Sequence, residues 1–85
     1  MNVYIFGRNK HSFRMEKLIL NRLRVVLAEK NKTNRWIAEQ LKVNENTVSK
    51  WTTNTQQPSL IMFYKISILL EIDIRDLFES TWPRK

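Results

Sequence analysis

The chain has 85 residues, of which 42% are hydrophobic, and a formal net charge of +7. This length allows one small domain with a modest core. The absence of Cys excludes a disulfide framework and a thiolate metal site, and a single His leaves too few ligands for zinc, so we expect no metal and no cofactor. No apolar run approaches the roughly 20 residues of a membrane span, and the first residues lack a secretory signal pattern. We therefore expect a cytoplasmic protein.

Positive charge is concentrated in the first part of the chain. Residues 1–14 carry a net +3, and residues 15–51 carry eight Lys and Arg against four Glu, a net +4. Residues 52–83 carry −2 and the last two residues +2. A chain whose N-terminal part is basic and whose C-terminal part is acidic could bind a polyanion on one side of the protein. Ordinary solvated charge would also account for the net value.

Residues 1–14 differ in character from the rest of the chain. Val3–Phe6 is a short β-like run, and Gly7, the only glycine of the sequence, is followed by a polar and basic connector. Three interpretations are open: a disordered basic arm, a strand that is added to a partner, or an upstream extension of little use, since Met15 could itself be a start codon. The composition favours a poorly ordered, flexible N-terminal arm.

Two helices are predicted next. Residues 16–30 show apolar side chains at helical spacing with no Gly or Pro, and Asn31, which tolerates a left-handed backbone, marks the end. The apolar positions are Ile19, Leu23, Val26 and Leu27. Thr33 is a good N-cap for a helix over residues 34–41. That helix would bury Ile37, Ala38 and Leu41.

A third helix is predicted over residues 44–51. Asn44 can accept a hydrogen bond from a free N–H of its first turn, and a rotation of 100° per residue sorts the side chains that follow into two faces. The inner face would carry Thr47, Val48 and Trp51, and the outer face Glu45, Asn46, Ser49 and Lys50. The small apolar face requires a scaffold to pack on. Two short helices joined by a turn of about three residues are typical of a helix-turn-helix motif.

The remaining chain completes a helical scaffold. Residues 52–58 are uncharged and rich in turn formers, which predicts a loop. Ser59 is the expected cap of a helix over residues 60–70, and Asp73 that of a short last helix. The buried side chains would be Leu60, Phe63, Ile66, Leu69 and Leu70 in the first and Leu77 and Phe78 in the second. We therefore divide the chain into an arm over residues 1–14, an all-α domain over residues 15–80 and a tail over residues 81–85.

Residues 19–78 resemble the lambdoid-repressor and Cro type of helix-turn-helix, the Xre-like regulators. The matching stretches are Thr33–Leu41, Val43–Trp51, Pro58–Leu60 and Ile72–Phe78, in unbroken register. No single stretch is specific, but their order and spacing together make a strong match. The resemblance implies a compact five-helix, lambda-repressor-like domain that binds operator DNA, usually as a homodimer.

The chain departs from this family at three turns and at one pair of side chains. Lys42, Asn54 and Glu71 stand where the family often has glycine. Asn54 tolerates a positive φ, whereas Lys42 and Glu71 disfavour a left-handed turn. Leu27 and Thr52 replace an Arg–Glu pair that is frequent in the family, and because both charges are absent neither is left unpaired.

The resemblance and the residue types together indicate how such a domain would contact DNA. Base contacts are expected on the outer face of the third helix, at Glu45, Asn46, Ser49 and Lys50. Phosphate contacts are expected at Thr33, Asn34, Arg35, Asn44, Thr53, Asn54 and Thr55. Two alternatives stay open: Glu45 could serve only the helix dipole, and Lys50 could be a solvated charge.

The sequence thus predicts a repressor-like transcriptional regulator that binds double-stranded DNA in a sequence-specific way, and hence a nucleoid-associated location. A homodimer would place two recognition helices roughly 34 Å apart on a palindromic operator. Its interface could include Ile74, Phe78 and Trp82, although these residues could instead complete the core.

Two other classes of function are set against this hypothesis. In the first, an antitoxin-like or phage accessory protein acts mainly on another protein, through Trp36, Trp82 or the Val3–Phe6 run; Trp36 could equally cover the core. The second, an enzyme, is disfavoured because the sequence offers no nucleophile–base set, no glycine-rich phosphate loop and no carboxylate cluster on a common face.

Overall fold

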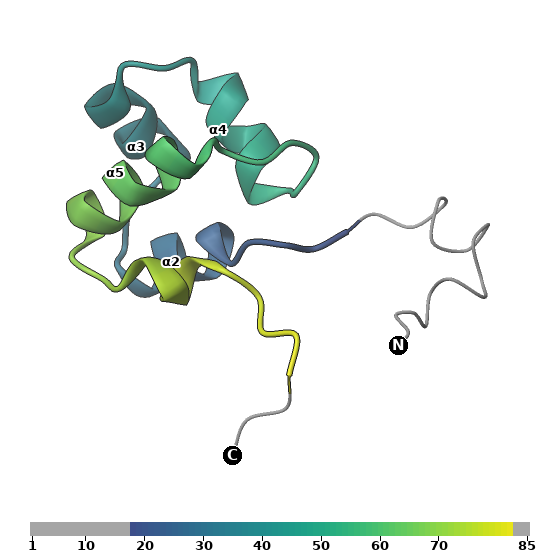
Figure 1. The fold of residues 1–85 in the computed structure, drawn as a ribbon. Helices are drawn as coiled ribbons and strands as arrows, with labels where there is room; N and C mark the ends of the chain where they lie inside the picture. The colour runs from purple at the N-terminus through teal and green to yellow at the C-terminus, as the bar shows by residue number, and fades with distance from the viewer. Residues whose placement is uncertain (1–17, 83–85) are drawn as a thin grey trace.

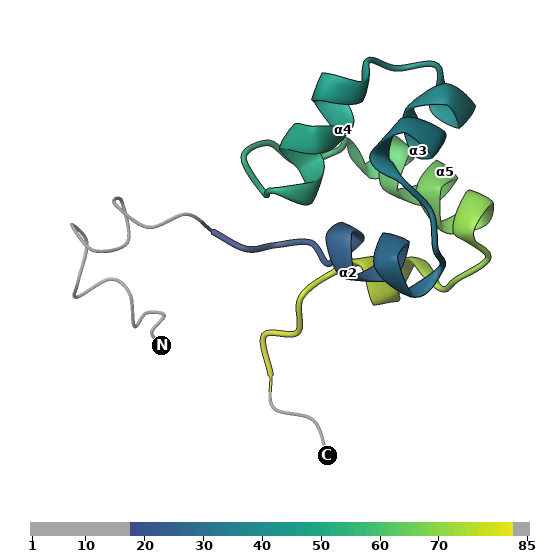
Figure 2. The ribbon, with the colours of Figure 1, turned by 180° about the vertical axis from the view of Figure 1, so that it is seen from behind.

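The computed structural model describes residues 18–82, which form four α-helices and one 3₁₀-helix. The elements are α2 (Leu23–Glu29), α3 (Asn34–Leu41), α4 (Glu45–Thr52), α5 (Leu60–Leu70) and the 3₁₀-helix η2 (Ile74–Leu77). At one end of the domain lie α3 and α4, at the other α2 with η2, and α5 crosses between them (Figures 1 and 2). The expected five α-helices are not confirmed within these residues, because the last element is a 3₁₀ turn. The predictions for residues 1–17 and 83–85 lie outside the described residues.

The first helix of the described domain begins later than predicted. Residues 18–22 are not helical. The backbone of residues 20–22 instead pairs with that of residues 77–79, through hydrogen bonds of 2.8 and 2.9 Å and an antiparallel bridge between Asn21 and Phe78. The Asn21 side chain then accepts a hydrogen bond from the Leu23 N–H, at 2.9 Å, where α2 begins. The prediction of a helix over these residues is therefore wrong, because contacts with the far end of the domain override the local helical pattern.

The other helices begin where their capping residues predict. The Thr33 hydroxyl accepts from the Trp36 N–H at 3.0 Å, and the Asn44 side chain accepts from the Asn46 N–H at 2.7 Å. The same geometry recurs at Ser59 and at Asp73, whose acceptor atoms lie 3.1 and 2.8 Å from backbone nitrogens of the first turn. Each cap satisfies a donor that has no partner inside its helix. The side chain and backbone N–H of Arg75 also lower the pKa of Asp73 through hydrogen bonds.

One hydrophobic core joins all five elements. Its buried members are Leu23, Val26, Leu27, Ile37, Ala38, Val48, Trp51, Phe63, Ile66, Leu70 and Leu77. Three predicted core residues are instead exposed, Ile19 with 59%, Leu60 with 72% and Phe78 with 36% of its area accessible to solvent. Ile19 precedes α2 in the extended segment, and Leu60 is the first residue of α5. Phe78 was expected to be buried but lies at the edge of the core, where the centroid of its ring is 4.6 Å from the centroid of the Phe63 ring.

Among residues 18–82, four residues adopt the left-handed conformation, and none of them is glycine. Their φ values are 58° or 59°, at Asn31, Lys42, Asn54 and Glu71. Lys42 and Glu71 end α3 and α5 with this conformation. These left-handed turns therefore form in spite of the steric cost that a side chain adds. The sequence argument that disfavoured a left-handed turn at Lys42 and Glu71 is wrong.

Replacing Glu71 by glycine is expected to stabilise the domain. A side chain costs roughly 1–2 kcal/mol in the left-handed region, and the greater freedom of glycine in the unfolded chain offsets roughly 0.5–1 kcal/mol of that gain. We expect a net gain of about 0.5–1 kcal/mol in the free energy of unfolding, measured by urea denaturation. The matched control is Glu39→Gly in the interior of α3, whose free energy of unfolding should fall by about 1 kcal/mol. A lower free energy of unfolding in both variants would contradict the claim that Glu71 is strained in its left-handed turn.

Candidate nucleic-acid interface

Helices α3 and α4 form a helix-turn-helix through a turn of three residues. The backbone N–H groups of Lys42 and Val43 both donate to the Ala38 carbonyl, which closes the end of α3. Val48 is fully buried and Trp51 is nearly so. These two side chains hold α4 against the rest of the domain, as the sequence predicted, so its opposite face is presented to solvent in a fixed orientation.

The four predicted base-contacting residues lie on that outer face of α4. Glu45, Asn46 and Lys50 are exposed, and Ser49 is half-buried at the edge of the face. Thr47, which was assigned to the inner face, is also half-buried. The structure thus brings an amide, a carboxylate, a hydroxyl and an ammonium group together on one rigid helical surface.

Glu45 has a neighbour on the preceding helix. The Arg35 Nε atom lies 3.8 Å from the Glu45 Oε1 atom, and both side chains are exposed. An exposed pair of this kind contributes little to stability. Its consequence is positional, since the pair links the first turns of α3 and α4 on the same side of the molecule.

The N-terminus of α3 is packed against the C-terminus of α4. The Asn34 Nδ2 atom lies 3.5 Å from the Thr52 hydroxyl, which itself donates to the Ser49 carbonyl at 3.1 Å. Thr52 is buried, and so is Leu27. A neutral hydroxyl and an aliphatic side chain thus occupy the two positions, Thr52 and Leu27, and no uncompensated charge is buried there.

The side-chain amide of Asn54, a residue predicted to contact phosphate, forms hydrogen bonds within the domain. Its Oδ1 atom accepts from the N–H groups of Leu20 and Asn21, at 2.9 and 3.0 Å, and from the Gln57 side chain at 3.1 Å. Its Nδ2 atom donates to the Asn21 carbonyl at 3.2 Å. These bonds tie the loop after α4 to the segment before α2. Sequence reasoning identified the left-handed turn but missed this role, because the partners lie 33 and 34 residues away.

Asn21 is the second half of this connection and was not singled out from the sequence. It is buried, and its Nδ2 atom donates to the Trp51 carbonyl at 3.0 Å and to the Gln57 side chain at 2.7 Å. The available signal was an asparagine directly after the apolar run of residues 18–20, because a buried amide requires hydrogen-bond partners. We call Asn21, Asn54 and Gln57 the amide cluster.

The loop after α4 keeps two hydroxyl-bearing residues on the surface. Its backbone folds over the end of α4, where the N–H groups of Thr55 and Gln56 both donate to the Lys50 carbonyl, at 2.9 and 3.1 Å. Thr53 and Thr55 are exposed, and their hydroxyl oxygens lie 2.9 Å apart. The amide cluster therefore fixes a polar loop, without negative charge, beside α4.

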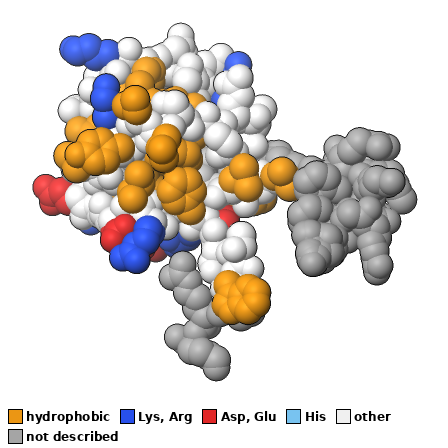
Figure 3. All heavy atoms as spheres, viewed as in Figure 1, with side chains coloured by type: hydrophobic (Ala, Val, Ile, Leu, Met, Phe, Trp, Pro, Cys, Tyr) orange, Lys and Arg blue, Asp and Glu red, His pale blue; other side chains and the backbone are white. Residues whose placement is uncertain are grey.

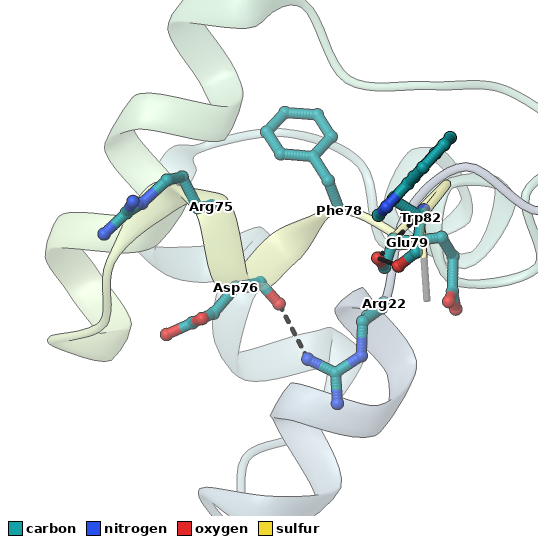
Figure 4. Close-up of a pocket in the computed structure, with 7 residues that line it drawn as sticks. Arg22, Arg75, Asp76, Phe78, Glu79 and Trp82 are labelled. Carbon is teal, nitrogen blue, oxygen red and sulfur yellow. Dashed lines mark hydrogen bonds between the residues drawn. The ribbon is translucent and has the colours of Figure 1, made fainter. Parts of the chain in front are cut away.

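The C-terminal segment forms a separate hollow. Arg22, Asp76, Phe78 and Trp82 line a cavity of about 280 Å³, across which the Arg22 Nη1 atom donates to the Asp76 carbonyl at 2.9 Å (Figure 4). Trp82 is 80% exposed. Among residues 18–82, no group of three or more His, Cys, Asp or Glu is placed to hold a metal ion. Within the same range, none of the helices has the length and apolar character needed to cross a membrane.

The family model of the Cro/C1-type helix-turn-helix DNA-binding domain matches residues 22–81. The chain belongs to this family. The resemblance to lambdoid repressors and Cro is thereby confirmed, and the family is one of DNA-binding domains rather than of enzymes.

A solved structure supports the Cro/C1-type assignment. It is described as "Crystal structure of a putative DNA-binding protein from Bacteroides fragilis" and is 53% identical in sequence, with a TM-score of 0.71. The match covers 73% of this chain and 100% of that one. No curated protein matches the chain. The Cro/C1-type domain thus occupies the described part of the chain, and its helix-turn-helix is formed by α3 and α4.

Proposed function

We propose that this Cro/C1-type protein is a transcriptional regulator that binds double-stranded DNA in a sequence-specific way, with α4 in the major groove. The observation that supports this proposal is the division of α4 into two faces. Val48 and Trp51 fix one face to the core, and the other presents Asn46 and Lys50 to solvent. A rigidly held helix with exposed polar side chains is the element that helix-turn-helix proteins place against base edges.

Each residue of the outer face has a base that suits its chemistry. The Asn46 amide can form two hydrogen bonds with adenine, and Lys50 can donate to the O6 and N7 atoms of guanine. Glu45 can accept from the N4 amino group of cytosine, and Ser49 can bond to several bases. Because Glu45 also lies near Arg35, we assign the larger share of base preference to Asn46 and Lys50.

Two groups of residues beside α4 would hold the phosphate backbone. The first lies at the start of α3, where Thr33, Asn34 and Arg35 surround the free N–H groups of a helix N-terminus. The second comprises Asn44 and the surface hydroxyls of Thr53 and Thr55. Asn54 was predicted to belong to this group, and we propose that it acts mainly by holding the loop through its internal hydrogen bonds. Such contacts orient the protein on DNA without selecting sequence.

We further propose that the protein acts as a homodimer on a palindromic operator and represses transcription from it. A single α4 covers one half-site. Two copies related by a twofold axis would place their α4 helices roughly 34 Å apart, one turn of DNA. The two half-sites then contribute together to affinity.

Replacing Arg35 by alanine is expected to weaken binding to all duplexes by a similar factor. Loss of one phosphate contact should flatten the slope of log K against log salt by about one unit and leave base preference unchanged. The measurement is fluorescence anisotropy with two unrelated duplexes over a series of salt concentrations. Arg75→Ala is the control, because Arg75 is exposed, lies on η2 and pairs with the capping residue Asp73. The helix η2 lies beside α2, at the other end of the domain from α3 and α4 (Figure 1). Altered sequence preference in Arg35→Ala would show that Arg35 contacts bases instead.

A further inference from the structure

A cleft lies between the start of α2 and the loop after α4. Its volume is about 240 Å³, and Ile19, Arg24, Thr53 and Glu79 are among the residues that line it. A water molecule takes up roughly 30 Å³ in the liquid, so the cleft has room for a phosphate group and several waters. Thr53 is exposed and belongs to the loop that the proposed function places against the DNA backbone. The cleft therefore adjoins the proposed DNA-binding surface.

Two arginines line this cleft, and they differ in what they bind. The Arg22 Nη1 atom donates to the Asp76 carbonyl at 2.9 Å, in the C-terminal hollow (Figure 4). Arg24 is exposed, and no hydrogen bond or ion pair joins its side chain to another residue of the range 18–82. A guanidinium group has five N–H donors in a fixed plane. At Arg24 these donors stand ready for an anion that enters the cleft.

The two walls of the cleft are tied together by the amide cluster. The Asn54 Oδ1 atom accepts from the N–H groups of Leu20 and Asn21, at 2.9 and 3.0 Å. The Asn21 side chain accepts in turn from the N–H of Leu23, the first residue of α2. Hydrogen bonds thus run from the loop to the turn that carries Arg24. Because this backbone is ordered before binding, an anion in the cleft would not have to bring the two walls together.

The cleft continues a row of polar residues that begins at α3. Asn34 and Arg35 are the first two residues of α3, and the Asn34 Nδ2 atom lies 3.5 Å from the Thr52 hydroxyl. Thr52 lines the cleft together with Arg24. The surface proposed for the phosphate backbone therefore extends past the end of α4 to the start of α2.

The face of the domain that carries α5 has a different character. Figure 3 shows hydrophobic side chains gathered over this helix, and Leu60, Tyr64 and Ile68 are exposed there. Lys65 is the single charged residue within α5. Such a face offers little attraction to a polyanion, whereas the cleft brings two arginines together with one carboxylate, that of Glu79.

We propose that Arg24 is a further phosphate-contacting residue, which binds the DNA backbone at the cleft between α2 and the loop after α4. This inference rests on the proposed function and adds a third element, α2, to the two groups of residues that hold the backbone there. A guanidinium group can donate to two oxygens of one phosphate at once. The contact contributes affinity without selecting sequence, because it does not involve a base.

Replacing Arg24 by alanine is expected to raise the Kd for a duplex of arbitrary sequence by about three- to tenfold, and to flatten the slope of log K against log salt by about one unit. Arg24→Lys keeps the charge, so it should retain the slope while losing part of the affinity with the planar geometry. Glu79→Gln removes the carboxylate of the cleft and should lower the Kd. Fluorescence anisotropy over a series of salt concentrations measures all three variants.

The matched control is Lys65→Ala, which removes a positive charge from the exposed surface of α5. It should leave the salt slope unchanged. Arg24 is exposed and forms no hydrogen bond with the described residues, so the circular dichroism and urea denaturation of Arg24→Ala should match those of the natural chain. A salt slope of Arg24→Ala equal to that of Lys65→Ala and the natural chain would overturn the role of Arg24 and leave the proposed function standing. A natural chain that binds no duplex would overturn both.

A scan with methylphosphonates locates the contact on the DNA. Each duplex of the scan carries one uncharged methylphosphonate in place of a phosphate, on the sequence that the natural chain binds most tightly. At the phosphate that Arg24 contacts, the substitution should weaken the natural chain but not Arg24→Ala, because the variant has already lost that contact. Equal losses for the two proteins at every position of the scan would contradict a direct contact.

Discussion

Replacing Asn54 by alanine is expected to lower the free energy of unfolding by about 2–4 kcal/mol. The amide forms four hydrogen bonds, of which three connect the loop after α4 to the segment before α2 and the fourth joins Asn54 to Gln57 within the loop. Alanine would leave backbone N–H groups of Leu20 and Asn21 without this acceptor, and it would also be strained at a φ of 59°. Small domains are stabilised by roughly 5–15 kcal/mol in total, so this single change should remove a large share.

Two further variants separate the causes of the loss at Asn54. Asn54→Gly keeps the left-handed turn without strain but removes the hydrogen bonds. Its free energy of unfolding should therefore lie below that of the natural chain and above that of Asn54→Ala. Asn31→Ala is the control for strain alone, because Asn31 has a φ of 58° and no side-chain hydrogen bond to the described residues. Urea denaturation followed by circular dichroism measures all three. Equal losses for Asn54→Ala and Asn31→Ala would mean that the amide cluster contributes no stability.

Replacing Lys50 by alanine is expected to relax base preference at one operator position, at a cost of about 1–3 kcal/mol on the preferred duplex. Lys50 lies exposed on the outer face of α4, one residue before the buried Trp51 that anchors the helix. The fold should be unaffected, because the side chain contributes nothing to the core. Competition binding with duplexes that differ at single base pairs measures the preference.

The matched control for Lys50 is Lys30→Ala, which removes the same charge at the end of α2, outside α3 and α4. Lys30→Ala should leave the ranking of duplexes unchanged. If Lys50→Ala likewise preserves the ranking and only weakens all duplexes, then Lys50 contacts phosphate and the assignment of a guanine contact is wrong.

Local signals predicted most of the fold. The caps at Thr33, Asn44, Ser59 and Asp73 depend on atoms two or three residues away, so the sequence alone was enough to place the starts of these helices. The inner face of α4 was equally predictable, because Val48 and Trp51 are adjacent on one side of a helix. Helical periodicity depends only on residues that are close in sequence, and in α4 the apolar face that it predicts is also the buried face.

The errors arose where distant contacts decide the structure. Helical spacing extended the first helix through Ile19, but Asn21 pairs with Phe78 and with Asn54, and these contacts impose an extended backbone. Leu60 fits the helical pattern of α5 and is nevertheless exposed, because periodicity does not show which apolar side faces the core when both sides are apolar. The amide cluster could not be predicted from the sequence, because Asn21 and Asn54 are far apart in the chain and no local pattern joins them.

The candidate site was predictable in its residue types and less so in its roles. Glu45, Asn46 and Lys50 were expected on an exposed face and are found there. No local pattern indicated that Glu45 lies beside Arg35 or that Asn34 is held against Thr52. These pairings depend on the crossing of α3 and α4, which is set by packing around Ala38 and Val48.

Selection from a random pool of DNA duplexes, followed by titration of the winner at two salt concentrations, tests the central claim most directly. Sequence-specific binding by a dimer predicts a short palindrome with half-sites one turn apart, adenine and guanine at the positions that face Asn46 and Lys50, and affinity that falls steeply with salt. Salt-dependent binding without any consensus sequence would contradict the claim.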